Sequence, residues 1–118
     1  MRIMYVDDQE DLLEIYEDET KIELENWEVS LAVNGIDALE KIKENRPNIL
    51  VTDIKMPKMG GLELAKELLQ KNEPITIIAI TGYPGDVSQD EMRACGISKI
   101  FEKPVDFDEL FAFIKTLP

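Results

Sequence analysis

The chain has 118 residues, 44% hydrophobic and 32% charged, so it can fold as one globular domain without disulfides or structural metals. Twenty-five acids against 13 bases give a net charge of −12 at pH 7, which repels phosphate backbones and argues against direct binding of nucleic acid. The sequence has no histidine, which excludes the commonest general base and the commonest transition-metal ligand.

The sequence also favours a cytoplasmic protein without a membrane partner. Its longest apolar runs, such as residues 77–80, are far too short to span a bilayer. The apolar stretch at residues 3–6 runs directly into acids without the small-residue cleavage site of a secretory signal. The single cysteine, Cys95, cannot form an internal disulfide, which fits a reducing compartment.

In the first third of the chain, residues 3–6 predict a short strand that ends at Asp7-Asp8. Residues 9–25 predict a helix, although Glu19 and Thr20 interrupt its apolar face where a core contact is expected. The acids crowded along this segment predict a solvated helix face: Glu14, Glu17, Asp18, Glu19, Glu23 and Glu25.

The middle of the chain repeats this order of strand and helix. Alternating apolar residues at 29–33 predict a second strand, and residues 36–42 have helical spacing before the break at Pro47. A third buried strand at residues 49–51 runs into Asp53. After Pro57 and Gly60-Gly61 interrupt the chain, the next helix is predicted at residues 62–69.

The last third contains two more strands, each followed by a helix. Residues 75–80 are rich in β-branched side chains and predict a strand that ends at Thr81-Gly82. A weaker helix is predicted at 86–95, with Gly96 as its C-terminal cap. Residues 100–101 predict a short strand before Glu102-Lys103-Pro104, and Asp106 is a favourable N-cap for the final helix.

Five units of strand and helix with continuous apolar strands predict a parallel sheet covered on both faces, in one domain spanning residues 1–118. The carboxyl ends of parallel strands lie at one edge of the sheet, where open α/β sheets bind ligands. We therefore expect Asp7, Asp8, Asp53, Thr81 and Lys103, which follow separate strands, to gather there. Each residue alone has an ordinary explanation in a turn, so it is their joint position that indicates a site.

These side chains favour phosphoryl chemistry supported by a divalent cation. Three neighbouring carboxylates repel one another, and Mg²⁺ relieves that repulsion while binding one or two of them. One carboxylate is then free to act as a nucleophile. Lys103 can pair with Asp53 at rest and with a phosphoryl oxygen afterwards, and Thr81 offers a hydroxyl donor beside the uncrowded Gly82.

The order of these motifs resembles the receiver domains of two-component response regulators over essentially the whole chain. The motifs are Asp7-Asp8, Asp53 followed by Met56-Pro57-x-Met59-x-Gly61, Thr81-Gly82, and Lys103-Pro104. The resemblance implies an α/β, flavodoxin-like (βα)5 three-layer sandwich whose parallel five-stranded sheet has the order 2-1-3-4-5.

The resemblance also implies a phosphorylation-dependent switch in a two-component phosphorelay. Asp53 would accept a phosphoryl group from a phosphohistidine on a histidine kinase or a histidine phosphotransfer protein. Asp8, Asp53 and the backbone carbonyl of Lys55 would bind Mg²⁺, and Asp7 would hold a metal-bound water.

Further implications concern the rest of the site and the output. Thr81 and Lys103 would grip the phosphoryl oxygens, and the Lys103–Pro104 peptide is expected to be cis. Phosphorylation would reshape the face formed by helix 4, strand 5 and helix 5, through which a homodimer could form. The domain would catalyse only its own phosphorylation and dephosphorylation, so it is not an enzyme with a free substrate.

Three positions depart from the family pattern. Ile100 stands where an aromatic side chain that swings inward is common, and Phe101 lies one place later. Gly60 replaces a common acid, and residues 8–27 form a segment about two residues longer than is typical.

Other functions are possible on the same sheet. The runner-up is a receiver-like protein-interaction module that acts without phosphorylation. Phosphoryl uptake on Asp53 would distinguish the phosphorylated switch from this module. A phosphatase with an aspartyl nucleophile requires a second acid where Lys55 stands. A flavodoxin is disfavoured because Asp7-Asp8 would repel the flavin phosphate, and Cys95 has no histidine to activate it as a nucleophile.

Overall fold

Strands and helices alternate along the chain from Arg2 to Lys115. The computed structural model describes residues 1–118, apart from the side chain of Pro84. The strands are β1 (Arg2–Val6), β2 (Glu28–Ala32), β3 (Ile49–Asp53), β4 (Thr76–Thr81) and β5 (Ile97–Glu102). The helices are α1 (Glu10–Glu23), α2 (Gly35–Glu44), α3 (Gly61–Gln70), the 3₁₀ helix η1 (Pro84–Asp86), α4 (Gln89–Ala94) and α5 (Phe107–Lys115).

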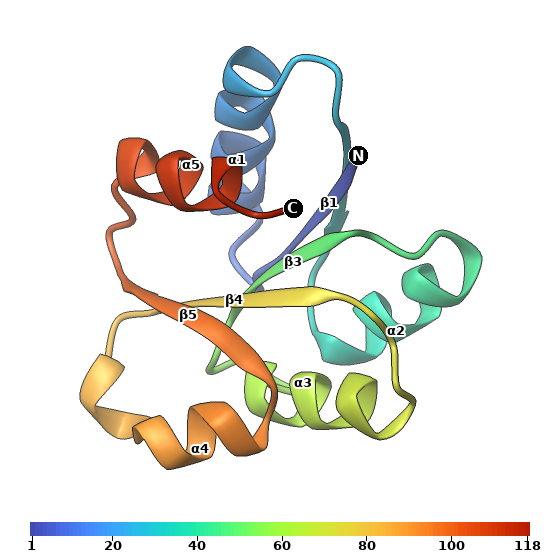
Figure 1. The fold of residues 1–118 in the computed structure, drawn as a ribbon, viewed down its shortest axis with the longest axis vertical. Coiled ribbons are helices and arrows are strands. Elements are labelled where there is room, and N and C mark those ends of the chain that lie inside the picture. Colours follow the sequence, from blue (N-terminus) through green and yellow to red (C-terminus); the bar gives the residue numbers. More distant parts are fainter.

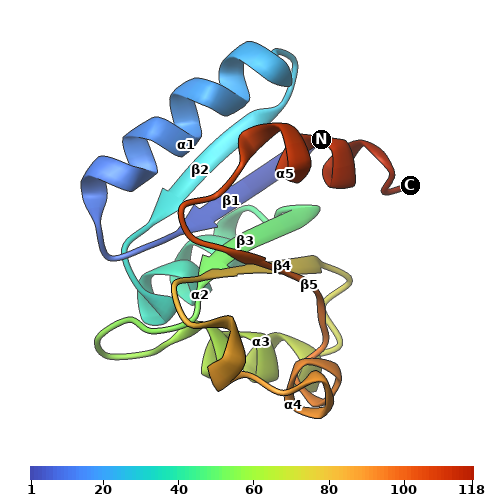
Figure 2. The same cartoon turned by 90° about the vertical axis from the view of Figure 1, so that its left-hand side faces the viewer.

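The described strands form one parallel sheet of five strands in the order β2-β1-β3-β4-β5. Helices α1 and α5 cover one face of the sheet, and α2, α3 and α4 cover the other (Figures 1 and 2). The predicted flavodoxin-like (βα)5 sandwich and its strand order are therefore confirmed.

Continuous apolar strands arise because both faces of the sheet are buried. Successive side chains of a strand point to opposite faces, so each strand contributes to two cores. In β1, Met4 and Val6 pack with residues of α2 and α3, whereas Ile3 and Tyr5 pack with residues of α1 and α5. The two cores fix the direction and the register of every strand, and with them the positions of the strand ends.

The register brings the carboxyl ends of the strands to one edge of the sheet. Val6 lies opposite Thr52 in the β1–β3 pair, and Thr81 lies opposite Glu102 in the β4–β5 pair. Lys103 continues the β4–β5 pairing, because its backbone N–H donates to the Thr81 carbonyl at 2.8 Å. The Lys103–Pro104 peptide is cis, as expected.

Helix α1 differs from the sequence prediction at Thr20. This side chain is fully buried, and its hydroxyl lies 2.6 Å from the Tyr5 hydroxyl in a hydrogen bond between α1 and β1. The apparent interruption of the apolar face is therefore a satisfied polar contact in the core. Ile22, one of the apolar residues of this helix, is instead 77% exposed.

The segment from β4 to β5 differs most from the predicted bounds. The helix predicted at 86–95 is divided into η1 and the shorter α4, and β5 begins at Ile97 rather than at Ile100. The predicted cap is confirmed, since Gly96 follows α4 with a φ of +75°, a conformation that favours glycine.

Among the described residues, no helix combines the length and the apolarity that crossing a membrane requires.

The turn between β3 and α3 requires glycine at position 61. The Gly61 N–H donates to the Ile54 carbonyl at 2.8 Å, and a Cβ at this position would collide with the Asp53 carbonyl oxygen. Because that oxygen belongs to the backbone at the end of β3, the chain could make room only by moving the strand end.

We expect Gly61→Ala to lower the free energy of unfolding by about 2 kcal/mol, because overpacking against fixed backbone costs roughly that much. Urea unfolding followed by circular dichroism measures the change. Gly85→Ala is the matched control, since a Cβ there meets no atom of the described residues within 4 Å other than those of its chain neighbours. Equal stability of the two variants would contradict the proposed collision.

Candidate functional site

Asp7, the first residue after β1, is a carboxylate buried at the edge of the sheet. Only 1% of its side chain is exposed. One carboxylate oxygen accepts the Gln9 N–H at 2.9 Å, and the other lies 3.0 Å from the Lys103 ammonium. The β1 core and the start of α1 therefore fix the position of this acid.

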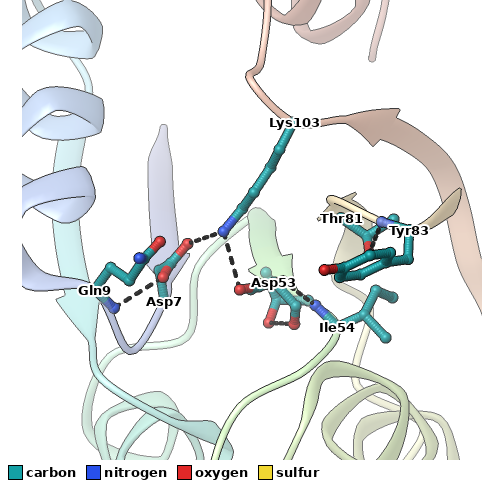
Figure 3. Close-up of polar contacts among 8 residues, drawn as sticks. Asp7, Gln9, Asp53, Ile54, Thr81, Tyr83 and Lys103 are labelled. Atoms are coloured by element: carbon teal, nitrogen blue, oxygen red, sulfur yellow. Dashed lines mark hydrogen bonds and ion pairs between the residues drawn. The ribbon is translucent and has the colours of Figure 1, made fainter.

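Lys103 lies between two carboxylates that come from neighbouring strands. Its Nζ is 3.0 Å from an Asp7 oxygen and 3.0 Å from an Asp53 oxygen (Figure 3). The other Asp53 oxygen accepts the Ile54 N–H at 2.7 Å. Asp53 remains slightly open to solvent, with 11% of its side chain exposed.

Asp8 adds a third acid on the solvent side. Oxygens of Asp7, Asp8 and Asp53 all lie within 4.8 Å of one another. Lys103 neutralises part of this charge, but it bonds to two of these acids and leaves the exposed Asp8 unpaired with it. Clustered carboxylate oxygens open to water are the ligands that Mg²⁺ prefers, so these residues fit that ion.

The pKa values of Asp7 and Lys103 are both raised, but for different reasons. Burial is the largest influence on Asp7 and raises its pKa above the usual 3.8, although the Gln9 N–H and Lys103 oppose the shift. Burial lowers the pKa of Lys103, but the hydrogen bonds and charges of Asp53 and Asp7 outweigh it and raise that pKa overall. The ammonium is thus well satisfied, whereas the ionised Asp7 carries a cost of desolvation.

Thr81 lies at the end of β4 with 2% of its surface exposed. Its hydroxyl oxygen accepts the Tyr83 N–H at 3.1 Å (Figure 3), which leaves the hydroxyl proton available to another acceptor. Apart from the two chain neighbours of Gly82, a Cβ at this position would meet no atom of the described residues within 4 Å, so nothing else crowds the backbone after Thr81.

Asp7, Asp8, Asp53 and Lys103 are thus brought together as the sequence predicted, with Thr81 at the same edge on β4. The side chain of Lys55, by contrast, extends to the next loop and pairs with Asp86 at 2.8 Å.

Sequence reasoning missed two neighbours of the site. Asp86 lies 31 residues after Lys55, and no local pattern pairs them. Tyr16 lines an apolar cavity of about 400 Å³ with Lys103 and Pro104. Burial, followed by the charge of Asp7, raises the pKa of Tyr16 to about 12. Its place among the apolar residues of the helix predicted at 9–25 indicated a core position and nothing more.

Comparison with known proteins identifies related chains along almost the entire length. The model of the response regulator receiver domain matches residues 3–115. The polar-differentiation response regulator DivK of Brucella anthropi is 29% identical over 97% of this chain and 93% of that protein. Sporulation initiation phosphotransferase F of Bacillus subtilis is 33% identical over 77% of this chain and 73% of its own length.

Other relatives are longer. The chain spans about half the length of the response regulator MprA of Mycobacterium leprae, covering 50% of it at 30% identity over 99% of this chain. Among solved structures, the response regulator TrrA of Thermotoga maritima, in complex with Mg²⁺-BeF, superposes with a TM-score of 0.85. It is 32% identical, and the match covers 99% of this chain and 98% of that one.

The raised pKa of Asp7 makes stability depend on pH. As the pH rises from 3.8, the unfolded chain loses this proton before the folded chain does. Ionisation of Asp7 therefore lowers the free energy of unfolding through that window, and the full cost is present above the raised pKa.

We expect Asp7→Asn to raise the free energy of unfolding at pH 7 by on the order of 1 kcal/mol, because it removes a desolvated charge, its amide oxygen still accepts the Gln9 N–H, and Lys103 keeps its bond to Asp53. The gain should shrink as the pH falls toward 3.8. Urea titrations at several pH values with chelator present measure it, and the exposed Asp18→Asn on α1 is the control. A variant less stable than the parent at pH 7 would overturn this reasoning.

Proposed function

This chain belongs to the family of response regulator receiver domains, and from that membership we propose that residues 1–118 form one receiver domain that accepts a phosphoryl group on Asp53. The observation that carries the proposal is the Lys103 ammonium, held 3.0 Å from both Asp7 and Asp53 at the carboxyl edge of the sheet. Phosphorylation-based signalling is the general activity of this family.

Asp53 is the best placed of the three acids to act as the nucleophile. Asp7 is 1% exposed and both of its oxygens are engaged, whereas the Asp53 side chain reaches solvent. The Ile54 N–H holds one Asp53 oxygen and orients the other toward Lys103. That oxygen would attack phosphorus, the P–N bond of a phosphohistidine would break, and its electron pair would return to the imidazole.

Lys103 and Thr81 would stabilise the transferred group. The Lys103 ammonium can move from the Asp53 carboxylate to a phosphoryl oxygen without leaving Asp7, so its charge stays in the site. The Thr81 hydroxyl, which already accepts the Tyr83 N–H, has its proton free for a second phosphoryl oxygen. Together the two donors, which come from the ends of β4 and β5, would hold the phosphoryl group on Asp53 at the end of β3.

The acid cluster would hold Mg²⁺. Asp8, Asp53 and the backbone carbonyl of Lys55 are the proposed direct ligands, and Asp7 would hold a water of the ion. The related TrrA was solved with Mg²⁺-BeF, which supports the same choice of ion for this chain. When bound, Mg²⁺ would neutralise negative charge on the acids and on the incoming phosphoryl oxygens.

The phosphoryl donor is proposed to be a histidine kinase or a histidine phosphotransfer protein. The domain would act as a switch in a two-component phosphorelay and would turn over only its own phosphoryl group. It would not bind nucleic acid or membrane directly.

We further propose that a homodimer, where one forms, uses the face of α4, β5 and α5. The competing function, an interaction module that is never phosphorylated, predicts the opposite result in the next experiment.

Incubation with Mg²⁺ and acetyl phosphate should add the mass of one phosphoryl group, which intact mass spectrometry detects. Asp53→Asn should abolish the adduct, as should chelation of the metal, whereas the exposed Asp18→Asn on α1 should keep it. Alkali should remove the group, because acyl phosphates hydrolyse readily. No adduct from either acetyl phosphate or a phosphohistidine protein would favour the interaction module instead.

Asp8→Asn should weaken Mg²⁺ binding about tenfold or more, because it removes one ligand and one negative charge from the cluster. The measurement is the rise in thermal stability with Mg²⁺ concentration, which reports a dissociation constant through binding to the folded chain. Asp11→Asn, a nearby acid in the first turn of α1, should leave the constant unchanged. An unchanged constant for Asp8→Asn would remove this residue from the proposed site.

A further inference from the structure

Lys55 connects two loops at the mouth of the site. It follows β3 by two residues, and its ammonium lies 2.8 Å from Asp86 of η1 and 4.7 Å from the centre of the Tyr83 ring. Tyr83 is itself tied to the site, because its N–H donates to the Thr81 hydroxyl (Figure 3). Lys55 therefore lies over the residue whose backbone is bonded to the proposed phosphoryl-binding threonine.

This connection is weak enough to exchange. The side chains of Lys55 and Asp86 are 61% and 55% exposed, and ion pairs this open to water are strongly screened. The contact with the Tyr83 ring is also at the surface, since Tyr83 is 64% exposed. The Lys55 ammonium can thus leave Asp86 whenever a stronger anion comes within reach.

Phosphorylation of Asp53 would create that anion. A phosphoryl group carries about two negative charges, against one on Asp86, and stands on the residue two positions before Lys55. The flexible four-carbon stem of lysine lets its point charge turn from one anion to another.

Resting on the function proposed above, we propose that Asp86 is a positioning residue that competes with the phosphoryl group on Asp53 for the Lys55 ammonium and thereby shortens the lifetime of the phosphorylated state. While Asp86 holds Lys55, the phosphoryl group lacks a cation on its outer side and stays open to water. When Lys55 turns inward, it pairs with phosphoryl oxygens and covers them.

The reaction under control is hydrolysis of the acyl phosphate. A water oxygen forms a bond to phosphorus, the bond from phosphorus to the Asp53 oxygen breaks, and the electron pair returns to the carboxylate. The proton of the water passes to solvent, and inorganic phosphate leaves. Lys55 would slow this step by pairing with the ground state and by occupying the approach of the water.

The same exchange would carry the signal to the segment between β4 and α4. Release of Asp86 removes the side-chain link between the β3–α3 loop and η1, whose Asp86 N–H donates to the Tyr83 carbonyl at 3.0 Å. The segment can then rearrange without the aromatic side chain that position 100 lacks, since Ile100 stands there.

A double-mutant cycle on the rate of phosphoryl loss tests the proposal. The chains to compare are the parent, Asp86→Ala, Lys55→Ala and the double variant, each phosphorylated with acetyl phosphate, freed of the donor and followed by intact mass. Asp86→Ala should slow the loss at least threefold, Lys55→Ala should accelerate it, and the double variant should match Lys55→Ala. Asp86→Glu should restore the parental rate, and Asp90→Ala, which removes an exposed acid of α4, should keep it.

The outcomes separate this inference from the function on which it rests. An Asp86→Ala effect of equal size with and without Lys55 overturns the competition, as does an unchanged or faster rate in Asp86→Ala, while phosphorylation itself stands. Failure of the parent chain to take up any phosphoryl group overturns both. Hydrogen exchange gives an independent check: phosphorylation should accelerate exchange of the Asp86 amide in the parent, and Asp86→Ala should exchange quickly at this position before phosphorylation.

Discussion

The Lys103 ammonium, shared at 3.0 Å by Asp7 and Asp53, is the contact on which the arrangement of the site depends. The two acids end neighbouring strands, while Lys103 follows β5 at the edge of the sheet and reaches back past β4. The contact requires parallel strands with β1 beside β3 and with β5 close enough for Lys103 to reach past β4, and the order β2-β1-β3-β4-β5 meets these conditions. The order also places Asp7 and Asp53 where the strand sequence reverses, which is the usual ligand crevice of such sheets.

Two cores hold this edge in place against the charges gathered on it. Apolar side chains from alternating positions of every strand pack on both faces, so the strand ends cannot shift singly. Desolvation nevertheless raises the pKa of Asp7, which means that the folded chain bears a cost when this acid is ionised. A cost of this kind is typical of functional sites, where charge is arranged for reaction rather than for stability.

The parts that the sequence predicted are those with strong local signals. Continuous apolar runs, each followed by helical spacing, define the parallel sheet, and the acids after those runs mark its edge. The two exceptions have different causes. Thr20 reads as an interruption because its partner, Tyr5, lies 15 residues away on β1. The start of β5 was missed because Ser98 and Lys99 are exposed on an edge strand and break the apolar run.

The site thus has two parts that differ in how firmly they are held. Asp7, Asp53 and Lys103 follow strands of the core and are largely buried, so their geometry is set by the fold. Lys55 and Asp86 lie on exposed loops and meet through a screened ion pair. Chemistry common to a family requires the fixed part, because misplacement of reacting groups is costly in rate. If the chain is phosphorylated as proposed, weak and exposed contacts of this kind can change the lifetime of the phosphorylated state without disturbing the core.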